Sequence, residues 1–335
     1  MPTIPRREFL RRSVLFPFAL GAAGPPAGGL FSLLARPGGA RRDATGSRLL
    51  RGAGRGSDVH RFRVGALECV AVSDGIRPYP ANMFFANAPE EELRAELAAG
   101  DDGPETVTSS YNCLVIRAGD EWAVVDTGIG PVDSSLGRLL PRLREAEIPP
   151  EEIATVVLTH GHPDHIGGLT DAGGNLNFPN ARFIMWRDEW EFWTSDQRLA
   201  ELPELMVRFA RKNLPPIAER VELLEREAEI LPGVRAFPTP GHTPGHMSLS
   251  LASEGEGLLV VGDAILHPLH IRRLEWHAAF DMDPEAARRT RRRLLERAVS
   301  EATDLHCFHF HPSPGIGTVE PDADRWRWSP AALSG

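Results

Sequence analysis

The sequence is poor in cysteine and in lysine, and the shortage of cysteine excludes whole classes of structure. Only three of the 335 residues are cysteine, and Cys69, Cys113 and Cys307 stand far apart. An odd number at this spacing builds neither a disulfide framework nor a paired-cysteine zinc site, so we expect three small buried apolar side chains. Lys212 is the single lysine, and arginine therefore supplies almost all of the positive charge. We interpret this preference for arginine as a feature of the overall composition and draw no functional conclusion from it.

The chain also lacks an excess of positive charge. Its formal net charge is −9, from 37 basic and 46 acidic side chains. Residues 1–40 contain five arginines and one glutamate, so the chain without them has 32 basic and 45 acidic side chains and a net charge of −13. Because contacts with phosphate supply most of the affinity for nucleic acids, this balance disfavours a nucleic-acid partner. With 42% hydrophobic and 25% charged residues the chain has a globular composition, and its length suits one large domain or two fused halves.

The first 40 residues have the pattern of an export signal. The charged stretch PRREFLR (5–11) precedes an uncharged stretch from Ser13 to Ala35, and the small residues GGA (38–40) follow. The arginine pair followed by Glu-Phe-Leu resembles the twin-arginine signal, which predicts export of a folded chain to the periplasm or the extracellular space. An uncleaved anchor and an arginine-rich amphipathic start are the alternatives. Proline and glycine in the stretch argue against a stable spanning helix, so we expect no membrane insertion after cleavage.

From His60 onward, strand and helix patterns alternate, after a lead-in over residues 41–57 that we expect to be flexible. The stretch DEWEFWTSDQRLAELPELM (188–206) predicts one helix. PEAARRTRRRLLERAVS (284–300) predicts a long helix whose basic residues indicate a solvated face. Strand patterns interleave with helical ones in two successive blocks, which suggests two β-sheets packed together with helices outside.

Residues 160–168, HGHPDHIGG, place three histidines and one aspartate within six positions. A buried-strand pattern ends at His160, so His162, Asp164 and His165 lie on the loop beyond the strand, where functional groups are commonly displayed. Imidazole and carboxylate without a nearby thiolate suit zinc or another borderline divalent ion. Four ligands on so short a loop cannot all reach one ion with good geometry, so we expect two adjacent ions.

Three later segments supply further candidate ligands, and each again follows a strand pattern. His242 lies in the turn TPGHTPGH, Asp263 ends the run GLLVVGD, and DLHCFHFHP offers either His309 or His311. A lone histidine is more often a core or surface residue than a ligand. The ordered series of histidine and aspartate at strand ends outweighs that interpretation.

The motifs THGHPDHIGG, TPGHTPGH, VVGDA and AVVDTGIG together resemble the metallo-β-lactamase superfamily over nearly the whole chain that follows the signal. VSDGIRPYPANMFF and the helical pattern after it resemble the beginning of methyl parathion hydrolase-like enzymes and their N-acyl-homoserine lactonase relatives. The resemblance implies an α/β fold over residues 58–335, an αββα sandwich in which two mixed β-sheets pack together with helices on both outer faces. It also implies a metal site at one edge of the two sheets.

By position, the resemblance assigns a role to each candidate. The first metal would be bound by His160, His162 and His242. The second metal would be bound by Asp164, His165 and His309. Asp263 would bridge both metals. His311 is the second choice for the last ligand, because HFHPSPGIG departs from the family's turn; we favour His309, which lies nearer the strand end. Asp126 in AVVDTG would orient a ligand from behind, with a turn cap as the alternative role.

We therefore predict a hydrolase that depends on two divalent ions, zinc in the first place and iron or manganese as alternatives. A hydroxide bridging the ions would attack a lactone, ester or phosphotriester, and Asp164 or a metal-bound water would protonate the leaving group. One alternative is a mononuclear iron dioxygenase of the same superfamily, which would not use Asp164 and His165. The other is a non-catalytic binding protein, which would have lost ligands. The expected partner is a small-molecule substrate, and the resemblance implies a homodimer.

Overall fold

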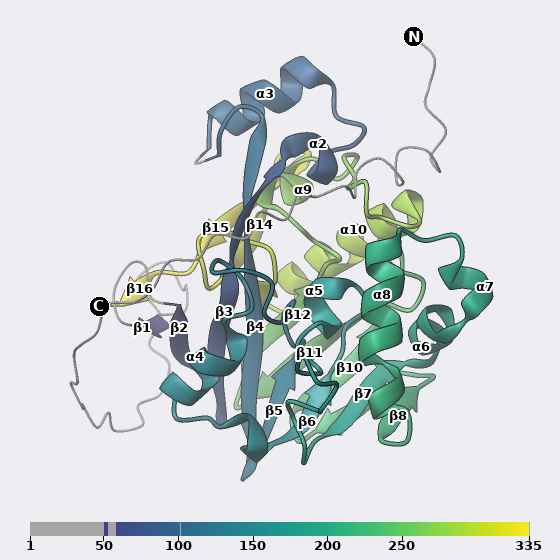
Figure 1. Cartoon of the computed structure of the whole chain (residues 1–335). Coiled ribbons are helices and arrows are strands. Elements are labelled where there is room, and N and C mark those ends of the chain that lie inside the picture. The colour runs from purple at the N-terminus through teal and green to yellow at the C-terminus, as the bar shows by residue number, and fades with distance from the viewer. Residues whose placement is uncertain (1–49, 53–57, 101, 335) are drawn as a thin grey trace.

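The computed structural model of the chain describes residues 50–52, 58–100 and 102–334. Its strands form two β-sheets that pack face to face, with helices on either side (Figure 1). The predicted export signal lies outside the described residues, and so does most of the predicted flexible lead-in. Residues 50–52 of that lead-in form a short strand of the first sheet. No helix within the described ranges is both long enough and apolar enough to cross a membrane.

The first sheet contains nine strands in the order β16-β1-β2-β3-β4-β5-β6-β7-β8. In chain order they are β1 (Leu50–Gly52), β2 (Val59–Val64), β3 (Leu67–Pro80), β4 (Thr106–Ala118), β5 (Glu121–Val125), β6 (Ile153–Val157), β7 (Arg182–Trp186), β8 (Val221–Leu224) and β16 (Leu333–Ser334). Neighbours from β1 to β5 pair antiparallel, whereas neighbours from β5 to β8 pair parallel. The carboxyl ends of β5 and β6 therefore meet at one edge of the sheet.

The second sheet contains seven strands in the order β15-β14-β13-β12-β11-β10-β9. In chain order they are β9 (Ala228–Leu231), β10 (Val234–Pro238), β11 (Met247–Ser253), β12 (Glu256–Gly262), β13 (Asp304–Cys307), β14 (Ile316–Asp322) and β15 (Arg325–Pro330). β12 and β13 pair parallel and the other neighbours pair antiparallel. The carboxyl ends of β12 and β13 are therefore also adjacent.

The helices connect the strands and cover both sheets. They are α2 (Ala81–Phe84), α3 (Glu90–Ala98), α4 (Leu139–Glu145), α5 (Pro163–Ile166), α6 (Arg187–Thr194), α7 (Asp196–Leu199), α8 (Glu204–Asn213), α9 (Pro268–Arg272) and α10 (Pro284–Ser300), with short 3-10 turns at Pro150–Glu152 and Pro215–Ile217. The single helix predicted over residues 188–206 is wrong, because α6, α7 and α8 divide this region. Ser195 caps α7 by accepting from the backbone N–H of Arg198, and Pro203, which has no N–H to donate, precedes α8.

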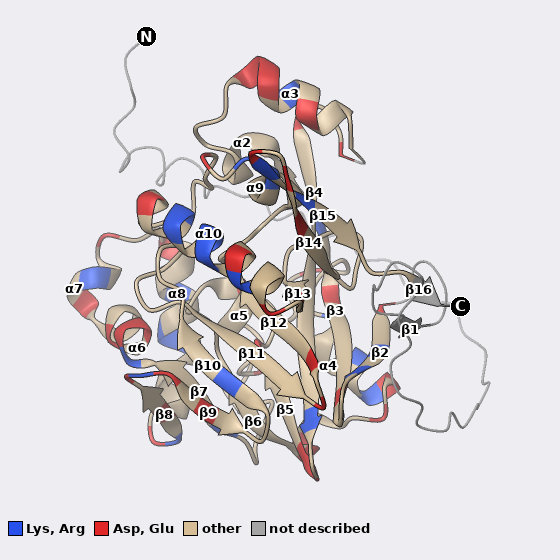
Figure 2. Ribbon diagram, turned by 180° about the vertical axis from the view of Figure 1, so that it is seen from behind, with Lys and Arg blue, Asp and Glu red and all other residues tan. Residues whose placement is uncertain are grey.

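Three apolar layers hold these elements together. Helices α4, α5 and α8 pack on the outer face of the first sheet, where Leu143 and Ile166 meet strand residues such as Val156. A second layer lies between the sheets, and a third lies between the second sheet and α10, which Figure 2 shows from behind. The sequence of β12 is a continuous apolar run because its residues alternately face the layer between the sheets and the layer under α10. The predicted αββα sandwich is confirmed.

Candidate metal centre

The candidate ligands gather where strands of both sheets end. β6 leads into His160, His162 and the short helix α5, which contains Asp164 and His165. The ends of β10, β12 and β13 lead to the remaining ligands, His242, Asp263 and His309. Among the described residues these side chains form two groups of possible metal ligands, and Asp263 belongs to both.

In the first group, three imidazole nitrogens and one carboxylate oxygen point at one another. His162 Nδ1 lies 3.0 Å from His160 Nε2 and 2.9 Å from His242 Nε2. Asp263 Oδ2 lies 3.3 Å from His242 Nε2 and 3.7 Å from His160 Nε2. With metal–nitrogen bonds of about 2.0–2.1 Å, the donors around a tetrahedral ion stand about 3.3 Å apart. The four atoms therefore have the spacing that the ligands of one ion require.

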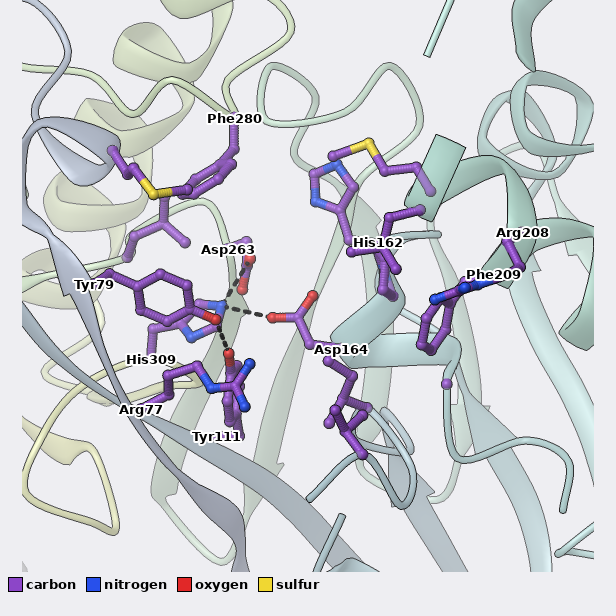
Figure 3. A pocket seen from close by; sticks show the side chains of 18 of the residues that line it. Arg77, Tyr79, Tyr111, His162, Asp164, Arg208, Phe209, Asp263, Phe280 and His309 are labelled. Carbon is purple, nitrogen blue, oxygen red and sulfur yellow. Dashed lines mark hydrogen bonds and ion pairs between the residues drawn. The ribbon is translucent and has the colours of Figure 1, made fainter. Parts of the chain in front are cut away.

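The second group shares Asp263 with the first, and its members Asp164 and His309 face the same space as Asp263 (Figure 3). His309 Nε2 lies 3.3 Å from Asp164 Oδ2 and 3.1 Å from Asp263 Oδ2. His165 Nε2 lies 3.3 Å from Asp263 Oδ1 and 3.8 Å from Asp164 Oδ2. Asp263 is placed to join the two groups, because Oδ2 faces His242 of the first group and Oδ1 faces His165 of the second.

Of the two candidates for the last ligand, the structure brings His309 into the cluster and leaves His311 outside it. His311 is exposed, and its Nδ1 lies 2.9 Å from the hydroxyl of Ser110. His309 is buried two residues after the end of β13, and its Nδ1 lies 2.8 Å from the hydroxyl of Ser109.

The residues fit a pair of divalent ions. His165 Nε2 and Asp263 Oδ1 are buried, and neither has a hydrogen-bond partner among the described residues. Leaving a buried polar atom without a partner costs about 1–3 kcal/mol, and a cation between these two atoms removes that cost. Nitrogen and oxygen donors without sulfur suit zinc and other borderline divalent metals. The pair of groups therefore provides two adjacent sites that share one carboxylate.

Four histidines are held from behind through the ring nitrogen that they turn away from the cluster. Such contacts fix the ring orientation and the tautomer of a metal ligand. The pairs are His160 with Thr159 at 3.1 Å, His165 with Asp126 at 2.8 Å, His242 with Asp281 at 3.0 Å, and His309 with Ser109 at 2.8 Å. Asp126 therefore lies where the sequence places an orienting carboxylate. It also accepts from the backbone N–H of Thr159, at 2.8 Å.

The pKa values of the ligand histidines are shifted in opposite directions. Burial, reinforced by the charge of His242, lowers the pKa of His162 to about 3. Burial also opposes a charge on His242, but hydrogen bonds with Asp263 and Asp281 outweigh it and raise the pKa of His242 to about 9. Burial also disfavours the charged form of His309, but the charge of Asp263 and a hydrogen bond with Asp164 outweigh burial and raise the pKa of His309 to about 9. Protons therefore compete with a metal ion for the ligand nitrogens of His242 and His309.

The sequence analysis missed the buried ion pair behind His242. Asp281 Oδ2 lies 3.3 Å from the guanidinium of Arg291, and both side chains are buried. Arg291 also donates to the carbonyl of Ala264, at 3.0 Å, and to that of Trp276, at 2.8 Å. Since Ala264 follows Asp263, the arginine braces the chain at two points beside the cluster.

The signal for this pair was present on α10, which the sequence analysis treated as a solvated basic face. Figure 2 shows several basic residues along α10, and the interpretation as a solvated face fits Arg292, which is exposed. Arg291, however, follows Ala287 by four residues and precedes Leu294 by three, and both of those side chains are buried. The position of Arg291 among buried residues of α10 was therefore the signal for a buried ion pair.

Glu189 is a second residue that the sequence analysis missed. It is buried in α6, and burial raises its pKa. One carboxylate oxygen accepts from the N–H of Gly161 at 2.9 Å and from Trp193 Nε1 at 2.6 Å, and the other accepts from the N–H of Gly245 at 2.8 Å. The side chain thus ties together the two loops that contain the three histidines of the first group. Gly161 has to be glycine, because a Cβ there would lie 2.4 Å from the ring of Trp193.

A cavity of about 520 Å³ opens beside the two groups. Its floor includes His162, Asp164 and His309, and its walls are largely apolar. Phe280 lies on one side and Phe209 of α8 on the opposite side (Figure 3). Phe84 of α2, which also lines the cavity, packs edge to face against Phe280, with ring centroids 6.0 Å apart. Apolar walls around a few convergent polar groups, at this volume, are typical of a site for a small molecule.

Both tyrosines of the chain line this cavity. Tyr79 of β3 and Tyr111 of β4 share a hydrogen bond between their hydroxyls, close to Asp164 and His309 (Figure 3). Burial raises the pKa of Tyr79 to about 12 and that of Tyr111 further above its usual range. Both phenols therefore keep their protons at neutral pH. Their mutual hydrogen bond uses one of the two phenolic protons.

Fold and site together define an αββα protein with a two-part histidine and aspartate centre at the edge of its sheets. The sequence profile of the Metallo-beta-lactamase superfamily matches residues 107–309, a range that includes every candidate ligand in the two groups. The match covers more than half of the chain. The chain belongs to the metallo-β-lactamase superfamily.

Curated relatives include N-acyl homoserine lactonases of bacilli. The lactonase of Bacillus cereus is 31% identical over 158 residues, which cover 47% of this chain and 54% of that protein. The lactonase of Bacillus thuringiensis is 30% identical over 210 residues, which cover 56% of this chain and 76% of that protein. The chain thus spans about half the length of the Bacillus cereus protein and three quarters of the other.

Solved structures show the same fold. AidC, described as a dizinc quorum-quenching lactonase in complex with a product, has a TM-score of 0.76 at 24% sequence identity, covering 83% of this chain and 98% of that chain. The hydrolase AbOPH of the beta-lactamase superfamily has a TM-score of 0.74 at 27% identity, covering 84% of this chain and 100% of that chain.

Proposed function

We propose that this protein is a hydrolase that opens a small lactone or cleaves a related ester, with two divalent ions, zinc in the first place, held by the two ligand groups. One observation carries the proposal: Asp263 joins two complete groups of ligands on the floor of an apolar cavity of small-molecule size. When bound, the ions would lower the pKa of water and so supply hydroxide at neutral pH. The lactonase relatives support a lactone as the first substrate to test.

The chain's own residues bind and orient the substrate. Phe84, Phe209 and Phe280 contact its apolar part and keep water from the reacting group. The tyrosine pair donates a hydrogen bond to the carbonyl oxygen, where negative charge develops during attack, and Tyr79 is the member closer to the cavity because Tyr111 is fully buried. Preorganised donors of this kind stabilise the transition state more than the ground state.

Asp164 is the residue that we assign to proton transfer. It lines the cavity, and its Oδ2 faces His309 at 3.3 Å, so Oδ1 is the oxygen that can hold a proton and pass it to the leaving alkoxide. Burial raises its pKa, but the nearby charge of His165 and the hydrogen bond with His309 outweigh burial and lower it. Asp164 is therefore ionised before the reaction; it would take a proton from the water that becomes the attacking hydroxide and pass that proton to the leaving alkoxide.

The competing functions make different use of the second group. A mononuclear iron dioxygenase would not use Asp164 and His165, yet both lie among the four possible ligands of that group. A non-catalytic binding protein would be expected to have lost ligands, whereas each sequence-predicted ligand except the alternative His311 lies in a group. Two complete groups favour the dinuclear hydrolase.

A substrate panel tests the proposal. Metal-free protein, reconstituted with zinc, is assayed against an N-acyl-homoserine lactone, an aryl ester, an aryl phosphotriester and a β-lactam. We expect zinc-dependent ring opening of the lactone or cleavage of the ester. His242→Ala should lose both activity and metal, whereas the matched variant His311→Ala should keep both. Turnover by His242→Ala, or no metal-dependent hydrolysis of any substrate, would overturn the proposal.

Export and assembly complete the proposal. We propose that residues 1–40 direct twin-arginine export and that the mature chain is a homodimer. Cell fractionation, with an Arg6→Lys/Arg7→Lys variant as the control, tests the first point. Light scattering of the purified protein tests the second.

A further inference from the structure

The α8 wall of the cavity combines apolar and basic side chains. Leu205, Arg208, Phe209 and Lys212 all line the cavity, and their spacing of three and four residues places them on one face of the helix. Leu205 and Phe209 are partly buried, whereas Arg208 and Lys212 are exposed. The basic side chains therefore stand at the rim of a wall whose inner part is apolar.

This wall lies opposite the reacting end of the cavity. Figure 3 shows Arg208 and Phe209 on one side and Tyr79 and His309 on the other, with Asp164 between them. A substrate whose scissile group lies at the metal centre can therefore extend its arm along α8 towards the rim.

Arg208 and Lys212 have no ion-pair partner within the part of the chain that the structure describes. Arg211, on the same helix, provides the contrast, since it does not line the cavity and pairs with Asp196 at 2.9 Å. Lys212 and Arg211 both lie in the last turn of α8, where a cation favours the helix dipole. The helix dipole favours a cation at both positions, so it does not explain why Lys212, which faces the cavity, is unpaired among the described residues while Arg211 is paired.

The charge balance of the cavity favours an anion. Among the described residues, Asp164 and Asp263 are the only acidic side chains that line the cavity, and both belong to the ligand groups. On the opposite rim the charge of Arg77 is already compensated by Asp133. In a chain with a net charge of −9, Arg208 and Lys212 thus bring two positive charges to the cavity side of α8, and these favour an anionic ligand.

We propose that Arg208 and Lys212 form a subsite for a carboxylate at the far end of the substrate's apolar arm. The preferred substrate class is then a lactone or ester whose arm packs on Leu205 and Phe209 and ends in a carboxylate. Two cations one helical turn apart can both donate charge-assisted hydrogen bonds to one carboxylate. The inference rests on the proposed hydrolase function and adds a choice of substrate to it.

Two esters with acyl chains of equal length test the subsite. The p-nitrophenyl ester of octanoic acid ends in a methyl group, and the mono-p-nitrophenyl ester of suberic acid ends in a carboxylate. The quantity measured is the ratio of kcat/KM for the anionic ester to kcat/KM for the neutral ester, in zinc-loaded wild type, Arg208→Gln/Lys212→Gln and Arg211→Gln. Zinc content and circular dichroism check that each variant is folded and loaded.

We expect the wild type to prefer the anionic ester and the double variant to lower the ratio about tenfold, the effect of losing a charge-assisted hydrogen bond at an exposed site. Arg211→Gln should leave the ratio unchanged. About 0.5 M salt should reduce the wild-type ratio, because exposed charges are screened, and this measurement needs no substitution.

A wild-type ratio near one that is insensitive to salt overturns the inference. So does a double variant with an unchanged ratio, or an Arg211→Gln variant that lowers the ratio equally. Turnover of both esters without discrimination leaves the hydrolase function intact and removes the subsite alone. Absence of metal-dependent turnover of either ester overturns the proposed function, and the subsite with it.

Discussion

Replacing Arg291 by methionine would keep the bulk of the side chain within α10 and remove the cation beside Asp281. The two side chains are 0% and 1% exposed, so neither charge is solvated in the folded protein. Removing one partner of a buried ion pair costs about 3–5 kcal/mol, because the remaining charge stays buried without compensation. The carbonyls of Ala264 and Trp276 lose their donors as well. We therefore expect the free energy of unfolding to fall by about 4–5 kcal/mol, the upper part of that range.

The same substitution should weaken the first metal site. Burial raises the pKa of Asp281, but its hydrogen bond with His242 and the charge of Arg291 lower it overall. Without the arginine the carboxylate is less firmly held against His242. Loss of a residue that orients a ligand typically costs about 10–100-fold in metal affinity, and we expect that loss for the first ion.

Urea unfolding of the metal-free protein and chelator competition for zinc measure the two effects. Arg292→Met, an exposed position on the same helix, is the matched control. In the double variant with Asp281→Asn the buried charge is gone, so its destabilisation should be smaller than the sum of the single effects by about 0.5–3 kcal/mol. The reasoning is refuted if Arg291→Met is no less stable than Arg292→Met, or if the two substitutions are simply additive.

Three further substitutions give distinct outcomes. His309→Ala should reduce the bound metal from two ions to one by elemental analysis, whereas two ions retained in it, or one lost in His311→Ala, would contradict the ligand assignment. Tyr79→Phe should lower kcat for lactone opening about 10²-fold with zinc content unchanged, since it removes one donor to the developing oxyanion; an unchanged kcat would remove the tyrosine from the mechanism. His306→Leu tests an acid-sensitive position on β13. Both ring nitrogens of His306 are buried without a hydrogen-bond partner among the described residues, and burial lowers its pKa from 6.5 to about 3. The folded chain keeps this ring neutral while the unfolded chain protonates it below pH 6.5, so stability is lost as the pH falls towards 3. His306→Leu should remove about 3 kcal/mol of the fall in unfolding free energy between pH 6.5 and pH 4, and equal falls in both proteins would contradict this.

The sequence predicts those parts of the site in which several ligands lie within a few residues of a recognisable strand end. His160, His162, Asp164 and His165 follow one buried strand, so a single motif contains four of the seven candidate ligands. Asp263 is recognisable for a similar reason, because a strand buried on both faces is a continuous apolar run and its end is easy to locate. The αββα arrangement follows from the same alternation of buried strands and amphipathic helices.

The remaining features depend on contacts that no local pattern contains. His309 and His311 differ only in how far each lies beyond β13, and the end of that strand at Cys307 is set by its pairing with β12 and β14. The β14–β15 hairpin was not predicted, because its strands contain proline and many charged residues. Asp281 and Arg291 are ten residues apart, and only the packing of α10 against the second sheet brings them together behind His242.

Zinc titration of the metal-free protein, with lactone opening and bound zinc followed together, tests the central claim most directly. The two ligand groups that share Asp263 predict that activity rises until two zinc ions are bound per chain and then stays constant. Full activity with a single bound ion, or a purified protein that contains one iron and no zinc, would contradict the dinuclear hydrolase.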